Sequence, residues 1–182
     1  ILESPSVQCK FGLGEDDLET ILHWIKSAQI RWGIDELHRQ RLGLPANAEN
    51  TWRAGIDRLL LGYAMPARAF RTFSGIAPCD VVEGSDALLL GRFAEFQDQL
   101  FKQVSALGEP RTLAAWSSCL TGLVDELFAA DESSGDELQM LRRKITELAE
   151  LAGAAEFDQP VDLTVIKHHL RHSLQRDGFG YG

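Results

Sequence analysis

The chain has 182 residues, of which 45% are hydrophobic and 25% charged, as is ordinary for a globular domain with a buried core. Its 27 acidic and 18 basic residues give a net charge of −9. This charge argues against nucleic-acid binding by the chain as a whole, because such binding depends on Lys and Arg neutralising phosphates. No membrane span and no secretory leader are visible.

Apolar residues at helical spacing predict helices through the first third of the chain. Small polar residues that can accept a hydrogen bond from the first helical turn indicate where two of these helices begin. The predicted helices cover about 15–28, from an Asp35 cap to Leu42, and from an Asn50 or Thr51 cap to Pro66.

Residues 66–85 contain two Pro and two Gly without a helical period, so we expect an irregular segment. Strand-like alternation is limited to a weak stretch at 79–82. Further helices are predicted at about 86–106, from a Thr112 cap to about 127, from an acidic loop at 131–137 to about 152, and at 162–176.

The predicted fold class is therefore all-α, an irregular multi-helix bundle. We expect a single helical domain over residues 1–182. It would consist of an N-terminal helical part (1–65), an irregular connection (66–85) and a four-helix part (86–182).

Both ends of the chain are consistent with a piece of a larger protein, because it begins with Ile1 and ends in a glycine-rich segment. In that case apolar residues near the ends should be exposed or poorly ordered, and the two ends should lie close together. The residues concerned are Ile1, Leu2, Val7, Phe179 and Tyr181.

No familiar catalytic motif is present. The dipeptide Gly-Lys of a phosphate-binding loop never occurs, and no Ser lies in a G-x-S-x-G turn. Cys9, Cys79 and Cys119 are far apart and form no C-x-x-C pair, which favours reduced thiols in a cytoplasmic protein. Two acidic pairs, Asp16–Asp17 and Asp136–Glu137, lie at predicted helix starts, where capping accounts for them. We expect no catalytic, cofactor or small-molecule site.

A metal site is the first alternative. His168 and His172 are four residues apart on the last predicted helix, so they share a face, and His169 lies beside them. Two His at this spacing can bind zinc when a third ligand is present. Neither H-E-x-x-H nor a Cys pair accompanies them, which favours a solvated helix face and no metal.

A basic surface on the last two predicted helices is the second alternative. It could contact phosphates or an acidic partner, and it would support a self-standing DNA-binding module. A solvated face that balances an acidic domain is the simpler interpretation. The candidate residues are Arg142, Arg143, Lys144, Lys167, Arg171 and Arg176.

Two blocks are more specific than a generic bundle requires, Ile30–Asp35 (IRWGID) and Asn50–Met65 (NTWRAGIDRLLLGYAM). A glycine in the first permits a tight turn, and two glycines seven residues apart in the second would let another backbone approach one helix face. We expect the blocks to pack on each other, with both tryptophans buried and the Asp35 carboxylate paired with Arg53 or Arg58. The signature residues are Arg31, Trp32, Gly33, Asp35, Trp52, Arg53, Gly55, Arg58 and Gly62.

These blocks, with the Leu44–Pro45 stop between them, resemble the RecC family, the gamma subunits of the exodeoxyribonuclease V (RecBCD) helicase–nuclease. The resemblance continues through 77–80 and 83–86, where Cys79 stands at a position that often holds an aromatic residue in the family. Beyond about residue 100 it depends mainly on the order of the helices.

The resemblance implies the helical insertion of the second lobe, the 2B position, in a protein that resembles superfamily 1 helicases but lacks their ATPase motifs. It implies a bacterial, cytoplasmic, non-catalytic domain that scaffolds contacts with RecB- and RecD-type subunits in a heterotrimer and shapes the DNA path. The complex would unwind and degrade double-strand ends in repair and recombination and respond to the Chi sequence. No catalytic or Chi-reading residue is carried over to this chain.

Overall fold

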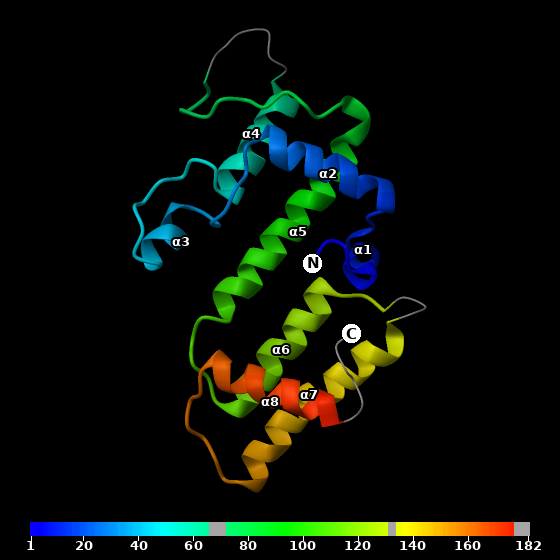
Figure 1. The fold of residues 1–182 in the computed structure, drawn as a ribbon, viewed down its shortest axis with the longest axis vertical. Helices are drawn as coiled ribbons and strands as arrows, with labels where there is room; N and C mark the ends of the chain where they lie inside the picture. Colours follow the sequence, from blue (N-terminus) through cyan, green and yellow to red (C-terminus); the bar gives the residue numbers. More distant parts are fainter. Residues whose placement is uncertain (66–71, 131–133, 177–182) are drawn as a thin grey trace. The chain divides into compact units, whose positions relative to one another are not determined.

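The computed structural model describes residues 1–65, 72–130 and 134–176 (Figure 1). Within these ranges the regular structure is helical and no strand is formed, which confirms the all-α prediction. None of the described helices is both long and apolar enough to cross a membrane. The helices are α1 (Pro5–Phe11), α2 (Glu15–Ser27), α3 (Glu36–Arg41), α4 (Trp52–Ala64), the 3-10 turn η1 (Gly84–Asp86), α5 (Ala87–Ala106), α6 (Leu113–Leu127), α7 (Gly135–Ala154) and α8 (Leu163–Arg176).

Three helices begin at the caps that the sequence predicts. The Asp35 carboxylate accepts a hydrogen bond from the His38 N–H at 2.8 Å at the start of α3. The hydroxyl oxygens of Thr51 and Thr112 accept from the N–H groups three residues later, each at 3.3 Å, at the starts of α4 and α6. These bonds satisfy donors that have no partner inside the first helical turn.

Helix α1 was not predicted. It begins with proline, which is favourable at the first position of a helix. Its seven residues are too few to show a helical period of apolar side chains. It also corrects the expectation for the N-terminal residues. Ile1 is 61% exposed, but Leu2 is half-buried and Val7 is fully buried, because α1 packs into the protein. Phe179 and Tyr181 lie outside the described residues.

The segment at 79–82 forms no strand, although Cys79 and Val82 are buried. The backbone N–H of Cys79 donates to the Arg58 carbonyl of α4 at 2.9 Å. The backbone of this weak stretch therefore packs against α4 at Cys79 instead of forming a strand.

The described chain divides into two compact units. Unit 1 contains residues 1–10 and 98–182, and unit 2 contains residues 11–97, so that α5 belongs partly to each. These boundaries fall at other positions than the parts expected from the sequence, and the single-domain organisation remains a prediction.

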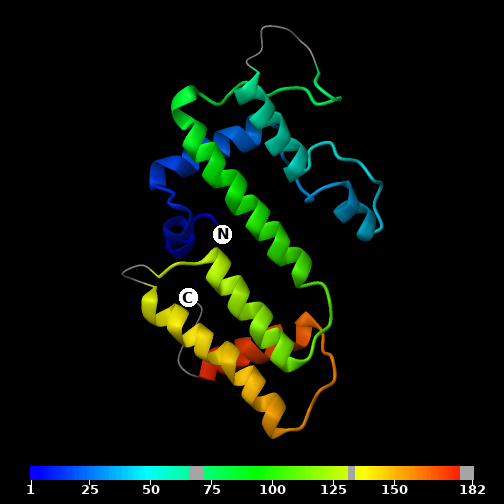
Figure 2. The ribbon, with the colours of Figure 1, turned by 180° about the vertical axis from the view of Figure 1, so that it is seen from behind.

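Unit 1 is built mainly from α6, α7 and α8, which lie side by side in both views (Figures 1 and 2). One apolar cluster contains the buried Trp116, Leu148 and Ile166, one residue from each of these helices. A second cluster joins Val124 of α6 to two residues of α7. Helix α1 is attached to α6 and its C-terminal loop, because the Lys10 ammonium donates to the Asp125 carbonyl at 2.7 Å and the Ala129 N–H donates to the Ser6 carbonyl at 3.0 Å.

Unit 2 contains α2, α3, α4 and the first half of α5. Helix α2 crosses α5 near its N-terminal end, whereas α3 and its flanking loops stand out to one side (Figures 1 and 2). Aromatic rings pack edge to face on α5, with Phe11 against Phe96 at 5.2 Å and Trp52 against Phe93 at 6.4 Å between centroids.

Candidate functional site

The two signature blocks meet through their backbones in unit 2. The N–H groups of Trp52 and Arg53 donate to the carbonyls of Gly33 and Ile34, each at 3.0 Å, and the Arg31 N–H donates to the Asn50 carbonyl at 2.9 Å. The first two bonds satisfy N–H groups in the first turn of α4 that no helical carbonyl can reach. The first block thus caps the second, and the expectation that they pack on each other is confirmed.

The glycines explain why the blocks fit. Gly33 adopts φ +84°, a left-handed backbone that other residues rarely take. A Cβ on Gly62 would overlap the Cys79 carbonyl, which confirms the predicted close approach of a second backbone. A Cβ on Gly55 would instead overlap the Ile30 side chain, so at this position the expectation of a backbone neighbour was wrong.

Two further expectations for the signature were also wrong. Trp32 is 45% exposed, because its ring lies against the Arg39 guanidinium at the surface, 4.8 Å from Arg39 Cζ to the ring centroid, while Trp52 is half-buried. Asp35 forms no ion pair with Arg53 or Arg58 within the described residues, since its carboxylate caps α3. Cap formation satisfies the carboxylate without a guanidinium.

Arg58 has another partner set. Its Nε donates to the Ala77 carbonyl at 3.0 Å and its Nη1 to the Ala28 carbonyl at 2.9 Å. One side chain of α4 therefore joins the C-terminal end of α2 to the segment before Cys79. A hollow of about 750 Å³ lies beside these bonds, and Asp35, Glu36, Glu49, Arg53, Asp57 and Arg58 provide its charged lining residues.

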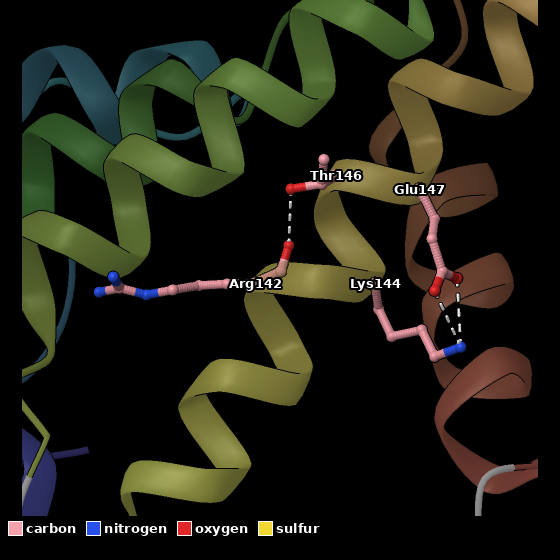
Figure 3. Close-up of polar contacts among 4 residues, drawn as sticks. All are labelled: Arg142, Lys144, Thr146 and Glu147. Carbon is pink, nitrogen blue, oxygen red and sulfur yellow. Dashed lines mark hydrogen bonds and ion pairs between the residues drawn. The ribbon is translucent and has the colours of Figure 1, made fainter.

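Two residues of the predicted basic surface have acidic partners on α6 and α7, and the surface as a whole remains a prediction. Figure 3 shows that Arg142 and Lys144 point to opposite sides of α7, as residues two apart must, since each step turns about 100°. Arg142 Nη2 pairs with Asp125 of α6 at 2.8 Å, and Lys144 Nζ pairs with Glu147 at 3.1 Å. Arg143, between them, is exposed.

The other three candidate basic residues lie on α8. Lys167, Arg171 and Arg176 are exposed and form no ion pair with any described residue. The helix contains no Asp or Glu over Leu163–Arg176. The side of α8 that faces α7 has acidic neighbours, because the shallow hollow between the two helices is lined by Glu147 and Glu150 as well as His169.

Among the described residues, the titratable side chains are dispersed over several helices. No three His, Cys, Asp or Glu side chains come together as metal ligands in the part of the chain that the structure describes, and His168, His169 and His172 are exposed on α8. Cys9 is exposed, Cys119 half-buried and Cys79 buried. Burial raises the pKa of the Cys79 thiol, Arg58 opposes this shift, and Asp80 adds to it.

The acidic pairs lie where capping was expected. The Asp17 carboxylate accepts a hydrogen bond from the Gly14 N–H at 2.7 Å, and Asp16 lies in the same first turn of α2. Asp136 and Glu137 lie in the first turn of α7, where negative charge is favourable. Residues 131–133 of the acidic loop fall outside the described residues.

One residue of interest was missed from the sequence. Arg39 is 8% exposed, and its two terminal nitrogens donate to the carbonyls of Asn47 and Trp32 at 2.8 and 2.9 Å. Its guanidinium has no carboxylate partner within ion-pair distance among the described residues, and its Nε has no hydrogen-bond acceptor there. Nothing in the short α3 sequence distinguishes Arg39 from its exposed neighbour Arg41, because a six-residue helix gives no clear buried face.

Comparison with known proteins identifies the origin of these blocks. Residues 1–178 match the family described as the RecBCD enzyme subunit RecC fourth domain. The chain belongs to the RecC family. A RecC subunit of Mycobacterium tuberculosis (strain CDC 1551 / Oshkosh) is 36% identical over 154 residues, which cover 85% of this chain and 14% of that protein.

Two other RecC subunits agree. The protein of Mycolicibacterium smegmatis is 37% identical over 153 residues, covering 84% of this chain and 14% of the relative. That of Escherichia coli (strain K12) is 27% identical over 177 residues, covering 97% of this chain and 16% of the relative. The chain thus spans about a sixth or less of these three relatives, each of which is named RecBCD enzyme subunit RecC.

Proposed function

We propose that this chain is a non-catalytic helical domain of a RecC-type subunit, where it scaffolds contacts with RecB- and RecD-type subunits and shapes the path of DNA during repair and recombination of double-strand breaks. The family match over residues 1–178 supports the assignment to this subunit. The 2B position of a helicase-like fold is part of the same proposal. The proposal includes no cofactor and no small-molecule substrate.

The bonding of the signature residues carries the non-catalytic part of the proposal. Gly33, Gly55 and Gly62 permit close packing, and Arg58 donates to two backbone carbonyls. Such groups hold a shape and offer no acid, base or nucleophile to a substrate. A domain whose most specific residues are structural is suited to holding other elements in position.

The first test uses the 182-residue chain alone. We expect it to hydrolyse neither ATP nor DNA at any salt concentration. Hydrolysis that survives repeated purification and elutes together with the chain would contradict the proposal.

A RecC-type subunit without its fourth domain provides the second test, in co-expression with RecB- and RecD-type subunits. We expect loss of heterotrimer assembly or of processive unwinding, measured by gel filtration and by strand separation of a duplex end.

A second function has one observation in its favour. Helix α8 carries three exposed basic residues and no acid, so the chain could bind DNA by itself through this face. A gel shift over a salt series tests this alternative with the variant Lys167→Ala/Arg171→Ala/Arg176→Ala and the control Lys26→Ala on α2. Binding that weakens only in the triple variant, with a salt slope smaller by about 0.9 for each lost phosphate contact, would support it.

A further inference from the structure

The outward face of α8 carries two histidines at its centre. Ile166 marks the buried side of the helix, because it is 1% exposed and belongs to the apolar cluster with Trp116. Since each helical step turns about 100°, His168 and His172 lie about 200° and about 240° round the helix from Ile166. Both side chains are exposed. They therefore share the face that points away from the buried cluster.

Basic side chains lie on both sides of this pair. Lys167 and Arg171 lie about 100° and about 140° round the helix from Ile166, and Arg176 lies at about 280°. All three are exposed and form no ion pair with any described residue. A chain of anionic groups that contacts Arg171 and Arg176 together would therefore pass over the two histidines. We call these five residues, Lys167, His168, Arg171, His172 and Arg176, the α8 face.

The third histidine of the helix has different surroundings. His169 lies about 300° round the helix from Ile166, on the side of α7, and lines the shallow hollow with Glu147 and Glu150. On the buried side of α8, α6 contributes apolar side chains and the Cys119 thiol. Helix α8 itself contains no Asp or Glu. Carboxylates of α7 therefore neighbour His169, which makes it an internal comparison for the other two histidines.

The side chains of this face suit phosphates better than an acidic protein segment. Thr164 and Gln175 are exposed between the directions of Arg171 and His168, and both donate hydrogen bonds that phosphate oxygens accept. A protein interface needs large apolar side chains at its centre. Val165 is 52% exposed, but the other large apolar side chains of α8 are partly or fully buried, namely Leu163, Ile166, Leu170 and Leu174.

We propose that phosphates of DNA bind across the α8 face with His168 and His172 as protonated donors, so that binding takes up protons from solution. Histidine is the side chain type whose charge changes between about pH 5 and 8. A protonated imidazole donates from both nitrogens and neutralises phosphate charge. DNA should therefore bind more tightly as the pH falls. This inference rests on the proposed role in the DNA path, to which it adds the contacting residues and the coupling to protons.

The first experiment measures the affinity of the 182-residue chain for a short rhodamine-labelled DNA duplex by fluorescence anisotropy, at constant ionic strength and with EDTA to remove metal ions. We expect binding to be about 10-fold tighter at about pH 6 than at about pH 8. His168→Gln/His172→Gln should lose most of this difference and keep the affinity at the higher pH. The controls His169→Gln on α8 and His23→Gln on α2, an exposed histidine, should retain the difference.

The second experiment measures the proton uptake directly, by calorimetry of the same binding in buffers of different ionisation enthalpy. We expect an uptake of about one to two protons near pH 7, which the double variant should abolish with unchanged thermal unfolding. Affinity that does not depend on pH, or a pH dependence that the double variant retains, would overturn the inference and leave DNA binding by α8 intact.

Two further outcomes separate the inference from the proposed function. Displacement of the duplex by poly-glutamate as effective as that by unlabelled DNA would overturn DNA as the ligand of the α8 face. Absence of DNA binding at both pH values would overturn the inference together with the DNA-binding alternative. The scaffold function would survive either result if removal of the whole domain still prevents assembly of the heterotrimer.

Discussion

Both units bury apolar side chains, but unit 2 adds close contacts of a more specific kind. In unit 2, Arg39, Arg58 and Arg92 each direct a guanidinium at backbone carbonyls, and glycines admit neighbours at Gly55 and Gly62. In unit 1 the described contacts between helices are mainly apolar, in two clusters between amphipathic helices. Positions in an apolar cluster tolerate many side chains of similar volume, whereas a position that lies directly against a backbone carbonyl tolerates only glycine. The comparison indicates that unit 2 carries the more specific sequence because its geometry permits fewer substitutions.

The largest effect is expected in the core of unit 1. Trp116 is fully buried, and its indole N–H donates to the Val161 carbonyl at 2.8 Å. Trp116→Ala should lower the free energy of unfolding by about 4 kcal/mol, because it leaves a cavity. Urea unfolding followed by circular dichroism measures the change. Trp116→Phe, which keeps a ring but loses the hydrogen bond, should cost less than half as much, and equal losses would show that the apolar cluster is not the main contribution.

Glycine substitution should separate the geometry of unit 2 from ordinary helix propensity. Gly62→Ala should cost about 3 kcal/mol, because the added Cβ would overlap the Cys79 carbonyl and part the two backbones. Gly91→Ala on α5 is the matched control, since its Cβ would meet nothing within 4 Å. We expect the control to be neutral or to stabilise by up to about 1 kcal/mol.

Labelling of the Cys79 thiol gives a local measurement of the same substitution. Its burial and raised pKa should make labelling slow in the unchanged protein, while exposed Cys9 reacts readily. Gly62→Ala should accelerate the labelling of Cys79 and leave that of Cys9 unchanged. Equal stability of the two alanine variants, or an unchanged rate of Cys79 labelling, would show that the contact between Gly62 and the Cys79 carbonyl does not restrict this position to glycine.

The two threonine caps provide a smaller, matched test. Thr51 is fully buried, and its hydroxyl also donates to the Ala48 carbonyl at 2.7 Å, whereas the Thr112 cap is half-exposed. Thr51→Ala should therefore cost about 2 kcal/mol and Thr112→Ala about 1 kcal/mol. Thermal unfolding of the two variants gives the difference, and a greater loss at Thr112 would reverse the comparison between the units.

The smallest effect is expected at the ion pair between α6 and α7. Arg142 and Asp125 are each about half exposed, so solvent and salt screen the 2.8 Å contact. Asp125→Asn should change the free energy of unfolding by less than about 0.5 kcal/mol in physiological salt. A loss above 1 kcal/mol that persists in 1 M salt would mean that the pair contributes more to stability than a solvent-screened surface pair can.

Helix positions and caps could be predicted from the sequence because they depend on local patterns. The caps at Asp35, Thr51 and Thr112 involve groups three residues apart, and their bonds are present. The opposite directions of the Arg142 and Lys144 side chains were also predictable, since two steps along a helix rotate the side-chain direction by about 200°. The error was to treat neighbours in sequence as neighbours in space.

Tertiary features of the candidate site could not be predicted in this way. The sequence does not distinguish a buried Trp32 from one that lies on Arg39 at the surface, because the outcome depends on where the loop around Asn47 returns. From the sequence, Asp35 could either cap a helix N-terminus or pair with an arginine. In the structure it caps α3. The family resemblance identified the blocks, but the roles of their side chains come from the packing of segments distant in sequence.

The composition of unit 1 has a consequence for synthesis on the ribosome. Its first residues, 1–10, emerge before unit 2, but the partners of Ser6 and Lys10 lie at Ala129 and Asp125. The contacts of α1 therefore cannot form until more than a hundred further residues have been translated, whereas the contiguous residues 11–97 of unit 2 are complete earlier. Helix α1 can dock only after α6 and the residues that follow it to Ala129 have been translated, so slow translation after residue 97 would lengthen the time during which α1 lacks these partners.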